Sequence, residues 1–284
     1  MDVLLDRLWE LANDGDKHDP AFSEPARVDR VNEARMLWRT LEVLVASFHP
    51  RELGVGDPAF TKLLVCVRTV LRDPGYWILP NDMQPSTEEH RSVFVYVTRV
   101  IVKLGNRGER EREAIVRDGI GDALARSLQP QGHQRQDAMA VATALHAFQT
   151  LALTPRNRSI LEAVGTVALC LEMMQLHELD VSVQSFGCKM LQQIVVETEC
   201  KDKVIQAGGL ATVLNALQKF GKDLTVATSG VDVIFLLSLE LDRHISRDEE
   251  LAQLQLEIAT CTVEVMRLHS HASKVVVHGI NLLH

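Results

Sequence analysis

Apolar positions recur at helical spacing in one segment of the chain after another. Residues 2–13 place Val3, Leu4, Leu8 and Leu11 at this spacing, and Asn13-Asp14-Gly15 ends the run. The same period predicts further helices over residues 28–48, 58–72 and 86–104. The last of these begins with Ser86-Thr-Glu-Glu89, a capping-box pattern. Proline-containing loops are predicted between these helices, at residues 14–27 and 73–85.

Beyond residue 86 two patterns repeat along the chain. A short helix, a glycine break and a second helix occur at 115–124, 160–169 and 204–213, with offsets of 45 and 44 residues. The glycines allow a sharp turn between two helices. A long helix repeats as well, through five-residue segments that begin at Val97, Ala144, Gly187, Gly230 and Gly279. Their first position is usually small, the middle one polar and the last two apolar, so the same face is buried in each repeat.

These features resemble armadillo repeats, and Val204–Leu214 is the most specific local match. The resemblance implies an all-α fold, a right-handed α-solenoid of armadillo-like repeats that forms an α-α superhelix. It divides the chain into a capping helix and loop at 1–27, a degenerate first repeat at 28–86 with a proline-rich insertion at 73–86, and armadillo-like repeats at 87–284, of which the last is expected to be incomplete. The repeat after Gly230 departs from the pattern, because 242–248 replaces a short helix and 249–268 is predicted to be one long helix.

In armadillo proteins the third, long helix of each repeat lines a concave groove that binds extended protein segments. The position of the family's groove tryptophan corresponds here to Arg99, His146, Lys189, Asp232 and Asn281, and that of its groove asparagine to Lys103, Thr150, Gln193 and Leu236. The ladder that binds nuclear localisation signals is therefore absent. Arg99, Lys103 and Lys189 instead predict a basic groove that suits an acidic peptide or protein face. The alternative is that these side chains are ordinary solvated positions.

Trp77 is a second candidate for protein binding. It lies in the proline-rich insertion and is predicted either to anchor an interface or to fold back over the next repeat.

Composition narrows the class of function. The net charge of −8 and the pI near 5.8 provide no basic excess for nucleic-acid binding. Five cysteines without a Cys-x-x-Cys pair favour a reducing compartment, and the N-terminus has no signal-peptide pattern. We expect a cytoplasmic protein, with cytoskeletal or nuclear sites as alternatives. The charge-free run at 138–155 has the length of a membrane span, but the repeat pattern predicts a buried helix there.

No catalytic, cofactor-binding or metal-binding motif is found in the sequence. His269 and His271 are the only close histidine pair, and Cys188 beside Lys189 is the one thiol considered for reactivity. The leading hypothesis is a non-catalytic scaffold or adaptor that binds a partner protein. The alternatives are a regulatory or docking region of a larger enzyme, such as a leucine-rich-repeat kinase, and self-association through the apolar C-terminal helix. We expect a fragment of a longer protein, or a partner that covers this end.

Overall fold

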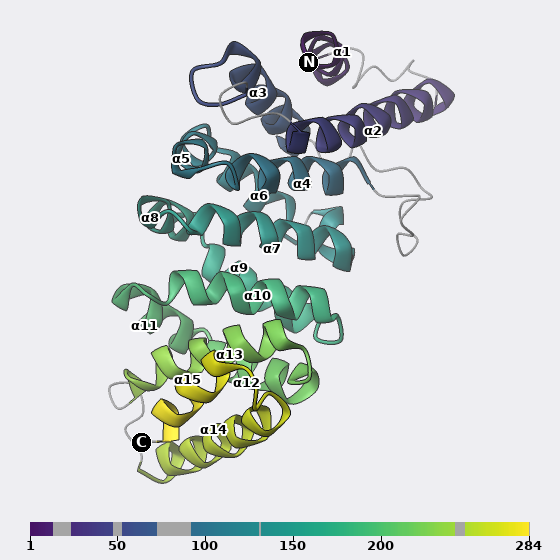
Figure 1. Cartoon of the computed structure of the whole chain (residues 1–284). Coiled ribbons are helices and arrows are strands. Elements are labelled where there is room, and N and C mark those ends of the chain that lie inside the picture. Colours follow the sequence, from purple (N-terminus) through teal and green to yellow (C-terminus); the bar gives the residue numbers. More distant parts are fainter. Residues whose placement is uncertain (14–23, 48–52, 73–91, 131, 242–247, 284) are drawn as a thin grey trace. The chain divides into compact units, whose positions relative to one another are not determined.

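A computed structural model describes residues 1–13, 24–47, 53–72, 92–130, 132–241 and 248–283, and the regular structure in these ranges is helical (Figure 1). The chain divides into two compact units, an N-terminal unit at Met1–Val164 and a C-terminal unit at Gly165–His284. The division falls between two helices, α8 and α9, and each unit is described separately below.

The N-terminal unit arranges its helices in rows. Its elements are α1 (Asp2–Asn13), α2 (Glu24–Ser47), α3 (Pro58–Arg72), α4 (Val93–Gly105), α5 (Glu109–Arg117), α6 (Ile120–Ser127), the 3-10 helix His133–Gln136, α7 (Ala138–Ala152) and α8 (Pro155–Ala163). Helix α4 lies between α2 and α7, and this row carries the predicted site of the unit (Figure 1). Outside the row of α2, α4 and α7, helix α3 packs on α6 and helix α5 packs on α8.

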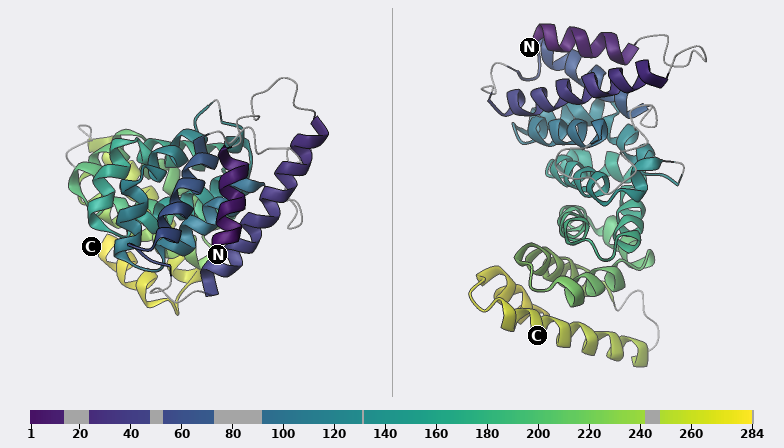
Figure 2. Two further views of the ribbon diagram at one scale, coloured as in Figure 1. Left: turned by 90° about the horizontal axis from the view of Figure 1, so that it is seen from above. Right: turned by 90° about the vertical axis from the view of Figure 1, so that its right-hand side faces the viewer.

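The C-terminal unit repeats this plan. Its elements are α9 (Thr166–Leu176), α10 (Val181–Ile194), α11 (Thr198–Gln206), α12 (Gly209–Phe220), α13 (Leu224–Ser238), α14 (Asp248–Leu268) and α15 (Ser273–Leu283). Helix α13 lies between α10 and α15, and the right-hand view of Figure 2 shows the green and yellow helices of this unit from the side. A second row of this unit consists of α9, α12 and α14, in which α12 contacts both of the other helices. The long helix predicted at 249–268 is confirmed, and it takes the place of a second helix of the repeat.

Two predicted helix starts differ from the structure. Helix α2 begins at Glu24 rather than at residue 28, because proline is tolerated in a first turn, where its missing N–H has no intrahelical partner. The described part of the next helix begins at Val93, and the Ser92 hydroxyl accepts a hydrogen bond from the Val95 amide. The capping box at Ser86 and the side chain of Trp77 lie outside the described residues. The helices at 2–13 and 58–72 have the predicted ends.

Glycines make the predicted sharp turns between the first and second helices of a repeat. Gly119, Gly165 and Gly208 have φ of 80°, 77° and 75°, and each stands immediately before a helix. An L-residue with a side chain is strained at such angles, whereas glycine is not.

Small residues also allow α10 and α13, two third helices of the C-terminal unit, to pack closely on the helices that precede them, α9 and α12. A Cβ at Gly187 would lie 2.5 Å from Met174 Sδ, and one at Gly230 would lie 2.9 Å from Leu217 Cγ. Both distances are shorter than van der Waals contact. The small residue at the start of the repeated five-residue segment therefore serves the close packing that the sequence predicts.

Side chains of the short helices bind the last carbonyls of the third helices in the N-terminal unit. The guanidinium of Arg112, on α5, donates to the Gly105 carbonyl at 3.0 Å and to the Thr154 hydroxyl at 2.8 Å. From α8, Asn157 donates to the Leu151 carbonyl and Arg158 to the Ala152 carbonyl, both at 3.0 Å. These bonds satisfy acceptors that a helix end leaves without an intrahelical partner.

The charge-free run considered as a membrane span forms α7, whose interior is largely buried in the unit. Within the described ranges, no single helix is both long enough and apolar enough to cross a membrane, and α8 with α9 meets the criteria only when the two are counted together.

Candidate functional site

Arg99 and Lys103 are the two side chains of α4 that reach solvent. Every other residue of this helix is buried, because α2, α7 and the helices behind them cover the remaining faces. The two cations are one helical turn apart, so they lie on the same face. Their side chains are 31% and 32% exposed. The sequence therefore identifies correctly which face of this helix is open, while the use of that face by a partner stays a prediction.

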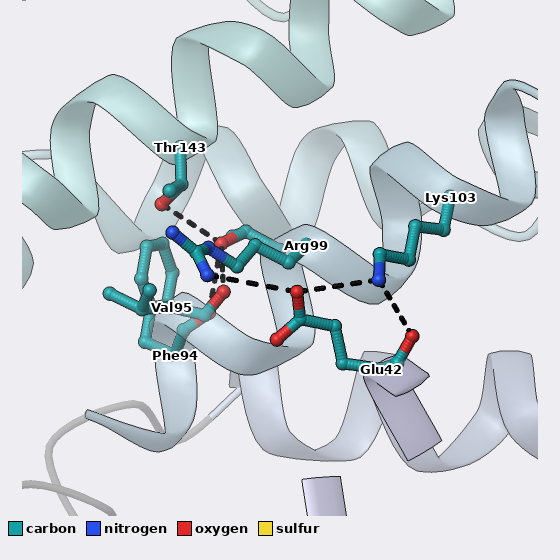
Figure 3. A network of polar contacts seen from close by, with 7 residues as sticks. Glu42, Phe94, Val95, Arg99, Lys103 and Thr143 are labelled. Atoms are coloured by element: carbon teal, nitrogen blue, oxygen red, sulfur yellow. Dashed lines mark hydrogen bonds and ion pairs between the residues drawn. The ribbon is translucent and has the colours of Figure 1, made fainter. Parts of the chain in front are cut away.

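A carboxylate from α2 lies against this pair of cations (Figure 3). Oε1 of Glu42 is 3.7 Å from Arg99 Nη1 and 3.5 Å from Lys103 Nζ. The Lys103 ammonium also donates to the main-chain carbonyl of Glu42 at 2.8 Å. The Glu42 side chain is 15% exposed, so it is the most enclosed of the three. We refer to Glu42, Arg99 and Lys103 as the basic cluster, because two cations share one carboxylate and leave a formal charge of +1.

A pair of threonines joins α4 to α7 next to the basic cluster. The hydroxyls of Thr98 and Thr143 lie 3.0 Å apart, and Figure 3 shows Thr143 above α4. Each hydroxyl also lies within hydrogen-bonding distance of a carbonyl one turn earlier in its own helix. Thr98 is fully buried. This contact fixes α4 against α7 directly beside Arg99.

On α7 the exposed face is formed by Met139, Thr143, His146 and Gln149. His146 is therefore placed as the sequence predicts, on the open side of the row. Thr150 is not, because it is 1% exposed and donates its hydroxyl to the His146 carbonyl at 2.9 Å. Its Cγ2 atom lies 2.8 Å from the position of a Cβ at Gly105, so it fills the contact with α4 instead. Gln149, one residue earlier, is the polar side chain that reaches the surface.

In the C-terminal unit, the predicted residues of α10 are half-buried on one face. The Lys189 ammonium lies 5.7 Å from the centre of the Phe186 ring, a cation–π distance. Gln193 lies on the same helix one turn later and is half-buried too. Both side chains keep part of their surface open to solvent.

Asp232 is the centre of a polar row that crosses three helices. Its carboxylate accepts hydrogen bonds from Gln192 Nε2, on α10, and from His278 Nδ1, on α15. The Phe235 ring stacks on the imidazole of His278, with centres 5.8 Å apart and planes at 27°. Asp232 is 7% exposed, so its carboxylate serves these internal bonds. Leu236 is half-buried and Asn281 is exposed.

Four residues of these contacts have no distinguishing pattern in the sequence: Glu42, Gln192, Phe235 and His278. Gln192 and Phe235 each precede an assigned position by one residue, and one residue is a 100° rotation around a helix. Glu42 lies in a helix that carries no repeat signature, so only the packing of α2 on α4 reveals it.

Reactive thiols and metal sites find no support among the described residues. All five cysteines are free and buried. Burial raises the pKa of Cys188 to about 12, so its thiol stays protonated at neutral pH. His269 donates from Nε2 to the Gly221 carbonyl at 2.6 Å. No group of three or more His, Cys, Asp or Glu side chains is placed to hold a metal ion in the described part of the chain.

Known structures share this architecture. An engineered protein matches with a TM-score of 0.64 at 15% identity, covering 98% of this chain and 96% of its own. A designed armadillo repeat protein matches with a TM-score of 0.62 at 13% identity, covering 99% and 98%. Another, solved in complex with the peptide (KR)4, matches with a TM-score of 0.59 at 14% identity and covers 98% of both chains.

At these identities the likeness concerns the fold alone, and the fold is an all-α solenoid of armadillo-like repeats. No protein-family model matches the sequence, and no curated protein matches it.

Proposed function

We propose that the chain is a non-catalytic scaffold that binds an extended acidic segment of a partner protein on the open face of the third helix α4 in its N-terminal unit. The observation that carries the proposal is the exposure pattern of α4, where two cations one turn apart are the solvent-accessible side chains of an otherwise buried helix. Such a pair complements carboxylates spaced along an extended chain.

The armadillo-like fold supports a binding role, since a designed armadillo repeat protein of similar fold was solved with the peptide (KR)4. That peptide is basic, whereas the basic cluster of this chain has a formal charge of +1. The ligand proposed for this chain is therefore acidic, whereas the peptide bound by the designed protein is basic. We also place the protein in a reducing compartment such as the cytoplasm, because its cysteines are free and buried.

Binding of labelled peptides tests the proposal. A short peptide of alternating Glu and Ser should bind, a matched peptide of alternating Lys and Ser should not, and fluorescence anisotropy distinguishes the two. Arg99→Glu should weaken binding of the acidic peptide strongly, because it replaces an attraction by a repulsion at the same place. Lys189→Glu tests the C-terminal unit separately.

A matched control is Arg126→Glu on α6, which makes the same charge change at a side chain that is 61% exposed and outside the third-helix row. Equal loss of binding in Arg126→Glu and Arg99→Glu would show that net charge alone attracts the peptide. Unchanged binding in Arg99→Glu and Lys189→Glu would refute the proposed surface.

Self-association stays a prediction. Helix α15 exposes Val277, Ile280 and Leu283 by 52%, 45% and 45%, and such residues suit a contact with a second copy. Sedimentation velocity over a range of concentrations measures this, and a strict monomer at high concentration would exclude it.

A further inference from the structure

We infer that Glu42 is an internal competitor for the partner's carboxylate, so that the basic cluster already holds a copy of the chemical group that it binds. The inference rests on the proposed function, because it concerns how the same acidic segment gains access to Arg99 and Lys103. It adds a residue on α2 that sets the affinity of the site.

The geometry of the carboxylate is that of a ligand held between two cations. A single oxygen, Oε1 of Glu42, faces both Arg99 and Lys103. The distances of 3.7 Å and 3.5 Å are ion-pair distances, and they exceed the roughly 2.7–2.9 Å of a charge-assisted hydrogen bond. The carboxylate therefore neutralises the pair without forming short bonds to it. A carboxylate that arrives from solvent is free of this constraint and can approach either cation more closely.

The lysine does not depend on the carboxylate for its position. Its ammonium donates to the main-chain carbonyl of Glu42 at 2.8 Å, the one short bond in the cluster. Removing the side-chain charge of residue 42 thus leaves Lys103 bound to α2. The main-chain carbonyl of Glu42 positions the Lys103 ammonium, and the side-chain carboxylate of Glu42 lowers the net charge of the basic cluster.

The charge of the site follows directly. With Glu42 ionised, the basic cluster carries +1, and without it the cluster carries +2. An acidic peptide should therefore bind Glu42→Gln about two- to fivefold more tightly than the wild type, a range appropriate to partly exposed charges. The gain should shrink as salt is added, because the added cation acts on the peptide through solvent.

Glu33 provides a matched control on the same helix. Its carboxylate is 39% exposed and pairs with Arg7 of α1, with Oε1 2.6 Å from Arg7 Nε. Glu33→Gln makes the same change in net charge as Glu42→Gln, yet it leaves Arg99 and Lys103 unaffected. Comparing the two variants separates the local effect from the overall charge.

The experiment measures anisotropy of the labelled Glu-Ser peptide with wild type, Glu42→Gln and Glu33→Gln, after circular dichroism has shown that each is folded. Tighter binding by Glu42→Gln alone supports the inference, and binding by Glu42→Gln where the wild type shows none supports it in its strongest form. Glu42→Ala, which keeps the main-chain carbonyl that holds Lys103, repeats the test if the first variant is unstable.

Three other outcomes overturn the inference, and they are distinguishable. Equal or weaker binding by Glu42→Gln, with the wild type still binding and Arg99→Glu defective, means that Glu42 positions the cations; the proposed function then survives. Equal gains in Glu42→Gln and Glu33→Gln assign the effect to net charge. No binding of the acidic peptide by any folded variant removes the proposed function together with the inference.

Discussion

Replacing Gly208 and Gly209 one at a time by alanine should destabilise the C-terminal unit through two separate physical causes. Gly208 has φ of 75°, and apart from the glycine itself and its two chain neighbours no heavy atom lies within 4 Å of the place that a Cβ would take. The cost of Gly208→Ala is therefore a backbone cost, about 1–2 kcal/mol for an L-residue in the left-handed region. Asparagine visits that region more readily, so Gly208→Asn should cost less than Gly208→Ala.

At Gly209 the expected cost is steric and does not come from the backbone angle. Its φ is not positive, but a Cβ there would lie 2.3 Å from Val204 Cγ1 and 2.8 Å from the Val204 carbonyl oxygen. Val204 is fully buried, and its carbonyl belongs to the main chain of α11, so neither atom can move aside by a simple rotation. Overpacking of this kind costs about 1–3 kcal/mol. Val204→Ala removes one of the two contacts, so Gly209→Ala should cost less in that background.

Urea unfolding followed by far-UV circular dichroism gives the free energies, and hydrogen exchange of the amides in α11 and α12 localises the loss. The reasoning about Gly208 fails if the asparagine and alanine variants are equally destabilised. That about Gly209 fails if the costs of Gly209→Ala and Val204→Ala are additive, because additivity would mean that the two side chains do not meet.

Four further predictions follow from the structure. Burial raises the pKa of Cys66 and Cys261 to about 11, so about one thiol in a thousand is ionised at pH 8, and Ellman's reagent should react with the native protein only at the rate of unfolding. Asp232→Ala and His278→Ala should show a coupling energy of about 1–3 kcal/mol in a double-mutant cycle of urea unfolding, whereas additive costs would contradict the bond between them. Phe148→Ala, at a fully buried ring, should cost about 3–5 kcal/mol by the same measurement, and a loss below 1 kcal/mol would contradict its place in the core. The hydrogen bond from Arg7 lowers the pKa of Glu33. The pair's contribution to stability is therefore present above the ordinary glutamate pKa and is lost as pH falls through the lowered value. Glu33→Gln should flatten this part of the plot of unfolding free energy against pH, and an unchanged plot would contradict the prediction.

The helices could be predicted well from the sequence where their apolar period is strong. Residues 58–72 have the predicted bounds because proline begins the helix and a proline follows its end by two residues. Helix α2 starts four residues before the position that the sequence predicts, because Pro25 is typical of a loop and is equally tolerated in a first helical turn.

The site was predictable only in part. The open face of α4 follows from its sequence, since Arg99 and Lys103 interrupt an otherwise apolar helix. Thr150 and Gln149 could not be separated, because neighbouring residues differ by 100° and the depth of packing on α4 decides which is covered. Glu42 could not be connected with Arg99 at all, since their pairing depends on how α2 packs on α4. Whether a partner uses these residues stays a prediction.

The hydrogen bonds that Asn157 and Arg158 give to the end of α7 have a consequence for synthesis on the ribosome. The last carbonyls of α7 obtain their donors from residues that emerge after the helix itself. Until then the Leu151 carbonyl has the Thr154 amide as a donor at 3.4 Å, while the Ala152 carbonyl has water as its partner. The last turn should therefore fray more readily before Arg158 is in place. The smallest fragment with an intact α7 therefore ends beyond Arg158, and a cut at the end of the helix would leave that turn open to proteases.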